Sequence, residues 1–392
     1  MRSVIHITLI STLITLSFLP NKCKGQAAEF EVEFLGLSEE AIIAFNHATD
    51  IWSNYLISEV PIKIVAHMQP LLPGQLGITF PNGELNYAAA PIADVWYASC
   101  LANAITGTDL NGDFADIEIY FSSLANWYYG LDENPGPTQY DFVSTVLHEI
   151  CHGLGFLSLS NKAGTIGSFG LIDASAFAPL TTTFVWPALD TLPSVFDVYL
   201  ENATGTVLTS LLNPSDELGT ELISNQIFFN SPEIIAETGG TRPKIYAPGT
   251  FTLGSSLSHW DEATYPVGND NEFMTPQAAA GHAGHQPGIL TLTVLEEIGW
   301  EINYDTATIS LQHINVSDIK IFPNPTQDIL FFERNEINSL LISIINTTGN
   351  IVYEKMFFDD IISISLKDLE SGMYLIKLQD DSGINYKNVM KL

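Results

Sequence analysis

The sequence predicts an α+β protein in which a domain of mixed strands and helices precedes a small antiparallel β-sandwich. Two observations indicate the first domain: residues 29–67 read as strand, helix and strand, and apolar residues recur at helical spacing from 141 to 154. A third observation indicates the second domain. From about residue 319 the chain becomes a series of short alternating runs separated by turns, at 329–332, 340–345, 351–356, 361–366, 373–378 and 384–389.

The first 26 residues have the pattern of a signal peptide, because Arg2 precedes an apolar run from Val4 to Pro20 and small residues follow at 25–28. No later stretch is long and apolar enough for a transmembrane segment, so we expect none in the mature chain. The net charge of −31 would repel nucleic-acid phosphates and anionic lipid, which excludes nucleic acid as an expected partner. Acidic exported proteins often carry Ca²⁺, and Asn111-Gly112-Asp113 is one cluster that could bind it, although acidity also serves solubility.

Strands and helices alternate through the first domain. Residues 30–35 alternate apolar and polar side chains and predict a strand, Ser38 opens a helix that runs to about position 56, and residues 61–65 resume a strand. A loop rich in glycine and proline follows from 70 to 83. Residues 116–121 then form a clear alternating strand. A helix from about 287 to 299 closes the domain.

The helix predicted over 141–154 carries the pattern H-E-x-x-H at residues 148–152. His148 and His152 lie one turn apart on the same face, so both imidazoles can reach one metal ion. Zinc needs a third protein ligand and an open position for a water molecule, whose pKa it lowers to about 7. Glu149 is well placed to take a proton from that zinc-activated water and to deliver it to a leaving amine.

Cys100 and Cys151 are the two cysteines that remain after removal of a signal peptide. Two cysteines in an exported protein are candidates for a disulfide, which would tie the predicted metal-binding helix to the rest of its domain. Two buried free thiols are an equal alternative.

Residues 148–156, His259 and residues 271–276 together resemble the leishmanolysin-like branch of the metzincin metallopeptidases. Most metzincins place a third histidine or an aspartate six residues after the second histidine, where this chain has Ser158, a poor zinc ligand. The leishmanolysin-like branch instead inserts a large segment, here residues 158–250, and supplies the third histidine later. The resemblance implies a metzincin-like catalytic domain over residues 27–303, with a twisted sheet and an active-site helix.

By this resemblance, His148, His152 and His259 bind one catalytic Zn²⁺ ion, and Glu149 is the general base and acid. Met274 lies in the Met-turn, a structural hydrophobic floor below the metal. The implied function is that of a secreted zinc metalloendopeptidase, a hydrolase that cleaves peptide bonds of peptide or protein substrates with zinc-activated water.

Residues 116–121 resemble the edge strand along which metzincins bind an extended substrate by β-augmentation.

Three alternatives to this interpretation stay open. His282 or His285 could replace His259 as the third ligand, and a glutamate such as Glu262 would instead give a gluzincin-type site. The chain could also be a surface adhesin or binding module that keeps a peptidase fold without turnover, although the intact Glu149 argues against loss of activity.

The C-terminal residues 319–392 resemble the sorting domain of the type IX secretion system of certain Gram-negative bacteria. This resemblance implies the secretion machinery as a partner and release into the medium or attachment at the cell surface, with residues 304–318 as a linker. The matching features are Phe322-Pro323-Asn324-Pro325, a turn at 346–349, residues 369–374 and the basic residues Lys387 and Lys391.

Overall fold

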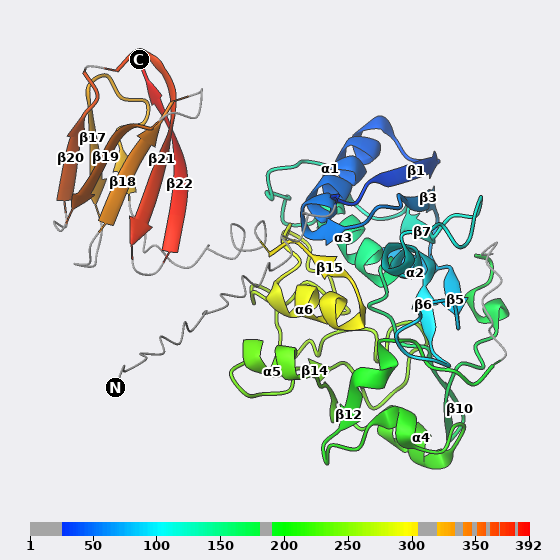
Figure 1. Cartoon of the computed structure of the whole chain (residues 1–392). Coiled ribbons are helices and arrows are strands. Elements are labelled where there is room, and N and C mark those ends of the chain that lie inside the picture. Colours follow the sequence, from blue (N-terminus) through cyan, green and yellow to red (C-terminus); the bar gives the residue numbers. More distant parts are fainter. Residues whose placement is uncertain are drawn as a thin grey trace, which may run out of the picture.

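The structure is a computed structural model that describes residues 26–180, 190–304, 320–333, 340–346, 351–357, 361–367, 369–380 and 383–392. Apart from their boundary residues, the predicted signal peptide and the predicted linker lie outside these ranges. The described residues form two units, of which residues 26–304 contain both helices and strands and residues 320–392 contain strands (Figure 1).

A four-stranded sheet organises the first unit, in the order β1-β3-β7-β4. Strands β1 (Phe30–Leu35), β3 (Ile62–Gln69) and β7 (Ile117–Ser122) run parallel, and β4 (Gly77–Pro81) pairs antiparallel to β7. The prediction that residues 116–121 form an edge strand is therefore wrong, because β7 lies between two neighbours and all six of its residues are buried. The two edge strands are β1 and β4, and β4, which pairs with β7, formed part of the predicted loop over 70–83.

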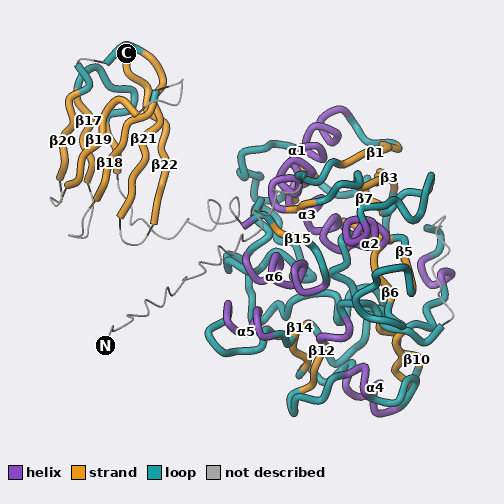
Figure 2. The backbone as a smooth tube through the Cα atoms, in the orientation of Figure 1, coloured by secondary structure: helices purple, strands orange, loops and turns teal. Residues whose placement is uncertain are grey.

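Helices α1 (Glu39–Tyr55) and α3 (Phe142–Gly153) cover the same face of this sheet (Figure 2). The ring of Phe121 on β7 lies 6.1 Å from that of Phe45 on α1 and 4.9 Å from that of Phe142 on α3. Both helices begin where their sequences predict, because Ser38 and Asp141 accept hydrogen bonds from backbone N–H groups of the first turn.

The indole of Trp52 on α1 donates a hydrogen bond of 3.1 Å to the carbonyl oxygen of Leu147 on α3, which fixes the two helices together.

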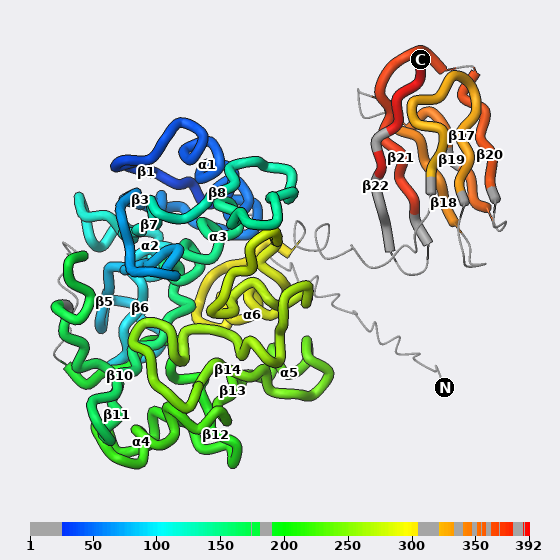
Figure 3. The backbone as a smooth tube through the Cα atoms, turned by 180° about the vertical axis from the view of Figure 1, so that it is seen from behind, coloured from blue at the N-terminus to red at the C-terminus, as the bar shows by residue number. Residues whose placement is uncertain are grey.

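The predicted insertion, residues 158–250, forms several small elements that lie at the opposite end of the first unit from β1 and β3 (Figures 1 and 3). Most of its buried apolar side chains belong to the same core as the sheet and helices, and the ring of Phe196 lies 4.8 Å from that of Phe156. Leu180 packs instead in a separate cluster with Leu71, Phe80 and Tyr120. The remaining elements of this unit are β2 (Leu56–Ile57), β5 (Gly83–Leu85), β6 (Trp96–Ala98), α2 (Ser99–Thr106), β8 (Trp127–Tyr128), β9 (Tyr140–Asp141), β10 (Ser160–Ala163), β11 (Ile166–Phe169), η1 (Ala174–Phe177), η2 (Asp197–Tyr199), β12 (Leu200–Asn202), η3 (Leu208–Ser210), α4 (Asp216–Glu221), β13 (Ile227–Phe229), α5 (Pro232–Glu237), β14 (Lys244–Ile245), α6 (Ile289–Ile298) and β15 (Glu301–Ile302).

The C-terminal unit consists of two antiparallel sheets, ordered β16-β17-β20 and β19-β18-β21-β22. Buried side chains from both sheets form a single cluster, which includes Leu330, Ile342, Ile364 and Ile376. Strands β17 to β22 fall at the six predicted alternating runs, whereas β16 was not predicted. In β18, alternation places every second side chain in that cluster. Their bounds are β16 (Lys320–Phe322), β17 (Ile329–Glu333), β18 (Leu340–Ile345), β19 (Ile351–Phe357), β20 (Ile361–Ser365), β21 (Gly372–Asp380) and β22 (Gly383–Lys391).

Candidate metal centre

Helix α3 carries His148 and His152 and ends directly after the second of them. A Cβ atom on Gly153 would lie 2.5 Å from the side chain of Ile117, so only glycine lets the helix end pack this closely on β7. At Gly155 the backbone takes a φ of +112°, a conformation that glycine adopts readily, and the chain turns back. This turn brings the carbonyl oxygen of Phe156 to 2.8 Å from Nδ1 of His152.

His259 reaches the same place from a loop 107 residues beyond His152 in the chain. The carbonyl oxygen of Ser255 lies 2.8 Å from its Nδ1, and its own carbonyl oxygen accepts a hydrogen bond from the backbone N–H of Tyr246. The next residue, Trp260, donates its backbone N–H to the carbonyl oxygen of Met274. These backbone contacts fix the loop that carries His259 to the segments at Tyr246 and Met274.

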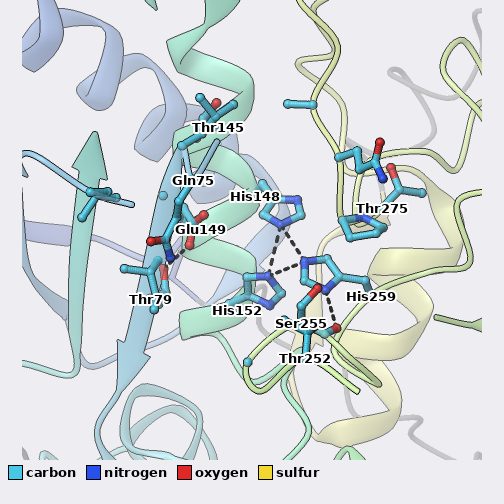
Figure 4. Close-up of a pocket in the computed structure, with 18 of the residues that line it drawn as sticks. Gln75, Thr79, Thr145, His148, Glu149, His152, Thr252, Ser255, His259 and Thr275 are labelled. Carbon is cyan, nitrogen blue, oxygen red and sulfur yellow. Dashed lines mark hydrogen bonds between the residues drawn. The ribbon is translucent and has the colours of Figure 1, made fainter. Parts of the chain in front are cut away.

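The Nε2 atoms of the three histidines form a nearly equilateral triangle (Figure 4). They lie 3.1 Å apart for His148 and His152, 3.2 Å for His152 and His259, and 3.3 Å for His148 and His259. Each Nδ1 faces a carbonyl oxygen, which can only accept, so Nδ1 carries the proton and Nε2 presents a lone pair. Three lone pairs that face one another repel, and a cation between them would remove that repulsion.

The charge state of the imidazoles suits metal binding, because burial lowers the pKa of all three histidines. The pKa of His259 falls to about 3, and the other two histidines raise the cost of protonating His152 further. Tetrahedral zinc with Zn–N bonds of about 2.0–2.1 Å would place its nitrogen ligands about 3.3 Å apart. The observed triangle fits zinc.

Glu149 lies beside this triangle and is 6 % exposed. The hydroxyl of Thr79 on β4 donates a hydrogen bond of 2.7 Å to its Oε2. Burial raises the pKa of the Glu149 carboxyl to about 7, and the hydrogen bond from Thr79 opposes this rise. A carboxyl with a pKa near neutrality can both accept and release a proton at the operating pH of most enzymes.

The alternative third ligands considered from the sequence do not lie at the triangle of Nε2 atoms. His282 contacts the carboxylate of Glu272, and Nε2 of His285 lies 2.9 Å from Oδ1 of Asp141. Glu262 is not among the side chains that gather at the three Nε2 atoms. Among the residues that the structure describes, the group able to hold one metal ion consists of His148, His152 and His259.

Met274 is fully buried in a turn that the backbone N–H of Thr275 closes on the carbonyl oxygen of Glu272. The residue before it, Phe273, supplies the carbonyl oxygen 2.9 Å from Nδ1 of His148. The turn predicted over residues 271–276 therefore contacts two of the three segments that carry the histidines. Phe273 faces the side chain of His148, and Met274 accepts a hydrogen bond from the backbone of Trp260, next to His259.

A cleft of about 1280 Å³ opens over the three histidines and Glu149. All five residues of β4 line it, whereas β7 does not. The residues predicted to line a substrate site, 116–121, therefore do not reach this cleft, whereas β4 does. Sequence reasoning also missed Thr79 and Gly77, because β4 lies within the stretch predicted as a loop and carries no local signal of a contact with Glu149.

Two alternatives from the sequence can be compared with side-chain contacts. Cys100 and Cys151 are buried free thiols, and the sulfur of Cys100 faces the carbonyl oxygen of Gly153 rather than a second sulfur. Around Asn111-Gly112-Asp113, the ammonium group of Lys63 bonds the carbonyl oxygen of Gly112, and the side chain of Asn111 is taken up by protein partners.

Comparison with known proteins identifies the family of the C-terminal unit. Residues 320–391 match the family of secretion system C-terminal sorting domains. The chain carries a type IX sorting domain. It is therefore a secreted or cell-surface protein with the secretion machinery as its partner. None of the helices in the described ranges is long and apolar enough to cross a membrane.

Other similarities are partial. Residues 109–172, which include α3, match a family described as SPBPB7E8-like. An endo-acting ulvan lyase from Formosa agariphila is 27% identical over 155 residues, which cover 39% of this chain and 29% of the lyase. The chain thus spans under a third of the length of that relative.

Two solved structures each match 19% of this chain with a TM-score of 0.18. One is a DUF3244 family protein from Bacteroides vulgatus with an immunoglobulin-like β-sandwich fold, at 20% identity and 83% of that chain. The other is PorZ, a surface component of the type IX secretion system of Porphyromonas gingivalis, at 16% identity and 11% of that chain.

Proposed function

We propose that this chain is a secreted zinc-dependent endopeptidase with a metzincin-like catalytic domain of the leishmanolysin-like branch. The observation that carries the proposal is the triangle of three Nε2 lone pairs, 3.1 to 3.3 Å apart, with a buried carboxylate beside it. The large segment between His152 and His259, and the buried turn at Met274, support the leishmanolysin-like assignment.

In the proposed hydrolysis, the three histidines and Glu149 have different roles. His148, His152 and His259 would hold the ion through Nε2. Bound zinc supplies Lewis acidity, which lowers the pKa of water and polarises a carbonyl group. Glu149 takes the proton from the attacking water and passes it to the leaving amine, so no covalent bond to the protein forms.

Strand β4 supplies a surface for an extended peptide. The backbone N–H of Ser122 donates to the carbonyl oxygen of Leu76, and this pairing directs alternate residues of the strand toward β7. Gly77 and Thr79 consequently direct their N–H and C=O groups to the open edge of the sheet. A peptide that pairs with this edge by β-augmentation would lie along the cleft beside the three histidines.

Two other functions remain to be separated from this one. A binding module on a peptidase fold would bind zinc without turnover, but it would have no need of a general base such as Glu149. The similarity to an ulvan lyase makes polysaccharide cleavage a second candidate. Such an activity would not need a triangle of histidines with a carboxylate at its side.

Cleavage of an unfolded protein by the mature chain tests the proposal, with Glu149→Ala and a chelated sample as controls. We expect one zinc per chain, cleavage by the wild type, and loss of cleavage in both controls, with zinc retained in Glu149→Ala. Zinc binding without cleavage of any peptide in a broad library would favour the binding module. Depolymerisation of ulvan by the wild type, with no proteolysis, would favour the lyase.

A further inference from the structure

Thr79 connects the open edge of β4 with the carboxylate of Glu149. We propose that Thr79 is the positioning residue of the general base, and that it couples base orientation to the strand on which substrate binds. This inference rests on the proposed function. It assigns a role to a side chain outside the H-E-x-x-H motif, 70 residues away from Glu149 in the sequence.

The hydrogen bond between the two residues has the usual length for a hydroxyl donor, and both residues are buried. Oγ1 of Thr79 lies 2.7 Å from Oε2 of Glu149, and the two residues are 9 % and 6 % exposed. Among the described residues, this is the hydrogen bond that the protein gives to the Glu149 carboxylate. A glutamate side chain has three rotatable bonds, so without this donor the carboxylate would be free to sample other orientations in the large cleft.

Gly77 provides an independent indication that β4 is shaped around the same carboxylate. A Cβ atom at Gly77 would lie 2.4 Å from Oε1 and 2.7 Å from Cδ of Glu149. Gly77 and Thr79 are two residues apart and therefore face the same side of the strand. Gly77 leaves space for the carboxylate of Glu149, and Thr79 donates a hydrogen bond to it.

The backbone and side chain of Thr79 serve different partners. Its N–H and C=O groups point to the open edge, where the proposed substrate pairs, and its hydroxyl points to Glu149. A peptide bound to this edge is consequently placed in register with the same residue that orients the base. Because Val has the shape of Thr and favours strands, Thr79→Val removes the hydroxyl and leaves both backbone groups in place.

The experiment compares the full mature chain with Thr79→Val, Thr79→Ser and, as a matched control, Thr293→Val. Thr293 is a buried threonine on α6 whose hydroxyl bonds a helix carbonyl. We expect Thr79→Val to lower kcat by about tenfold, a part of the roughly 10²–10⁴-fold that a positioned general base contributes. KM should change by less than about twofold, because substrate pairing is intact. Thr79→Ser should recover most of the activity, and zinc content should stay at wild-type level.

Crystal structures of the wild type and Thr79→Val give a readout that does not depend on activity. We expect Glu149 in one conformer bonded to Thr79 in the wild type, and in several conformers in Thr79→Val. A kcat of Thr79→Val equal to that of the wild type, or equal to that of Thr293→Val, overturns the inference. If the wild type binds zinc but cuts nothing, the proposed function falls instead. The crystal structures then decide alone, and one unchanged Glu149 conformer in both proteins overturns the role of Thr79.

Discussion

Replacing Gly77 with alanine should abolish most catalysis and leave the metal in place. The added methyl carbon would lie 2.4 Å from Oε1 of Glu149, whereas ordinary contacts begin at 3.4 Å. The difference, 3.4 − 2.4 = 1.0 Å, is the distance by which the carboxylate or the strand has to retreat. The three nearest heavy atoms that this methyl group would meet all belong to Glu149.

The expected loss follows from that displacement. A misplacement of about 1 Å in a catalytic site can lower the rate on the order of a hundredfold. We therefore expect kcat/KM of Gly77→Ala to fall about a hundredfold, which corresponds to about 2.7 kcal/mol of transition-state stabilisation. Alanine is favoured over glycine in the interior of a strand by roughly 0.5–1 kcal/mol, so general unfolding should not be the cause of the loss.

Hydrolysis of a fluorogenic peptide, measured per bound zinc, is the assay. Gly249→Ala is the matched control, because a Cβ atom there meets nothing within 4 Å and its φ is not in the left-handed region. Activity of Gly77→Ala within about twofold of that of Gly249→Ala would refute the reasoning. It would mean either that β4 does not lie against Glu149 or that Glu149 is not the general base.

Three other perturbations follow from the same structure. His259→Ala should weaken zinc binding by at least about a hundredfold, more than loss of an outer partner costs, whereas Glu262→Ala should retain zinc in a metal analysis. Cys100 and Cys151 should resist thiol reagents in the native protein, since burial raises the pKa of both thiols well above its usual range, and both should react after denaturation. Burial raises the pKa of Asp197 from 3.8 to about 6, so the unfolded chain ionises first as pH rises and the native state loses stability across that window. The test is denaturant titration of the chelated wild type and of Asp197→Asn at several pH values between 4 and 6. Relative to the variant, the free energy of unfolding of the wild type should drop by up to roughly 3 kcal/mol across this window. Equal pH dependence of the two free energies would contradict this.

The local features of the site could be predicted from the sequence because they depend on neighbours along the chain. Helix α3 follows from apolar residues at helical spacing, a capping Asp141 and glycines after the second histidine. The same spacing places His148 and His152 on one face. His259 could be named only by resemblance, since nothing in the local sequence around it distinguishes a metal ligand from His282 or His285.

Tertiary pairing could not be predicted in the same way. Residues 117–122 alternate, but each strand face is covered, by helices on one side and by the residues around Leu71 and Leu180 on the other, so alternation did not mark an exposed face. Strand β4 is short, begins with glycine and ends with proline, and therefore has the composition of a loop. Its contact with Glu149 joins positions far apart in sequence, and no pattern of one segment encodes it.

Main-chain atoms orient the three imidazoles of the candidate metal centre, and this decides which substitutions around them can be tolerated. Each imidazole is held at Nδ1 by a main-chain carbonyl oxygen, from Phe156, Ser255 and Phe273. Side-chain substitution at these three positions leaves the carbonyl groups in place, so the orientation of the ligands depends on the turns that carry them. Neutral carbonyl partners would also add no negative charge around a bound ion. Glu149 lies beside the three histidines, and its carboxylate is the proton acceptor that we propose for this site in a strongly acidic protein.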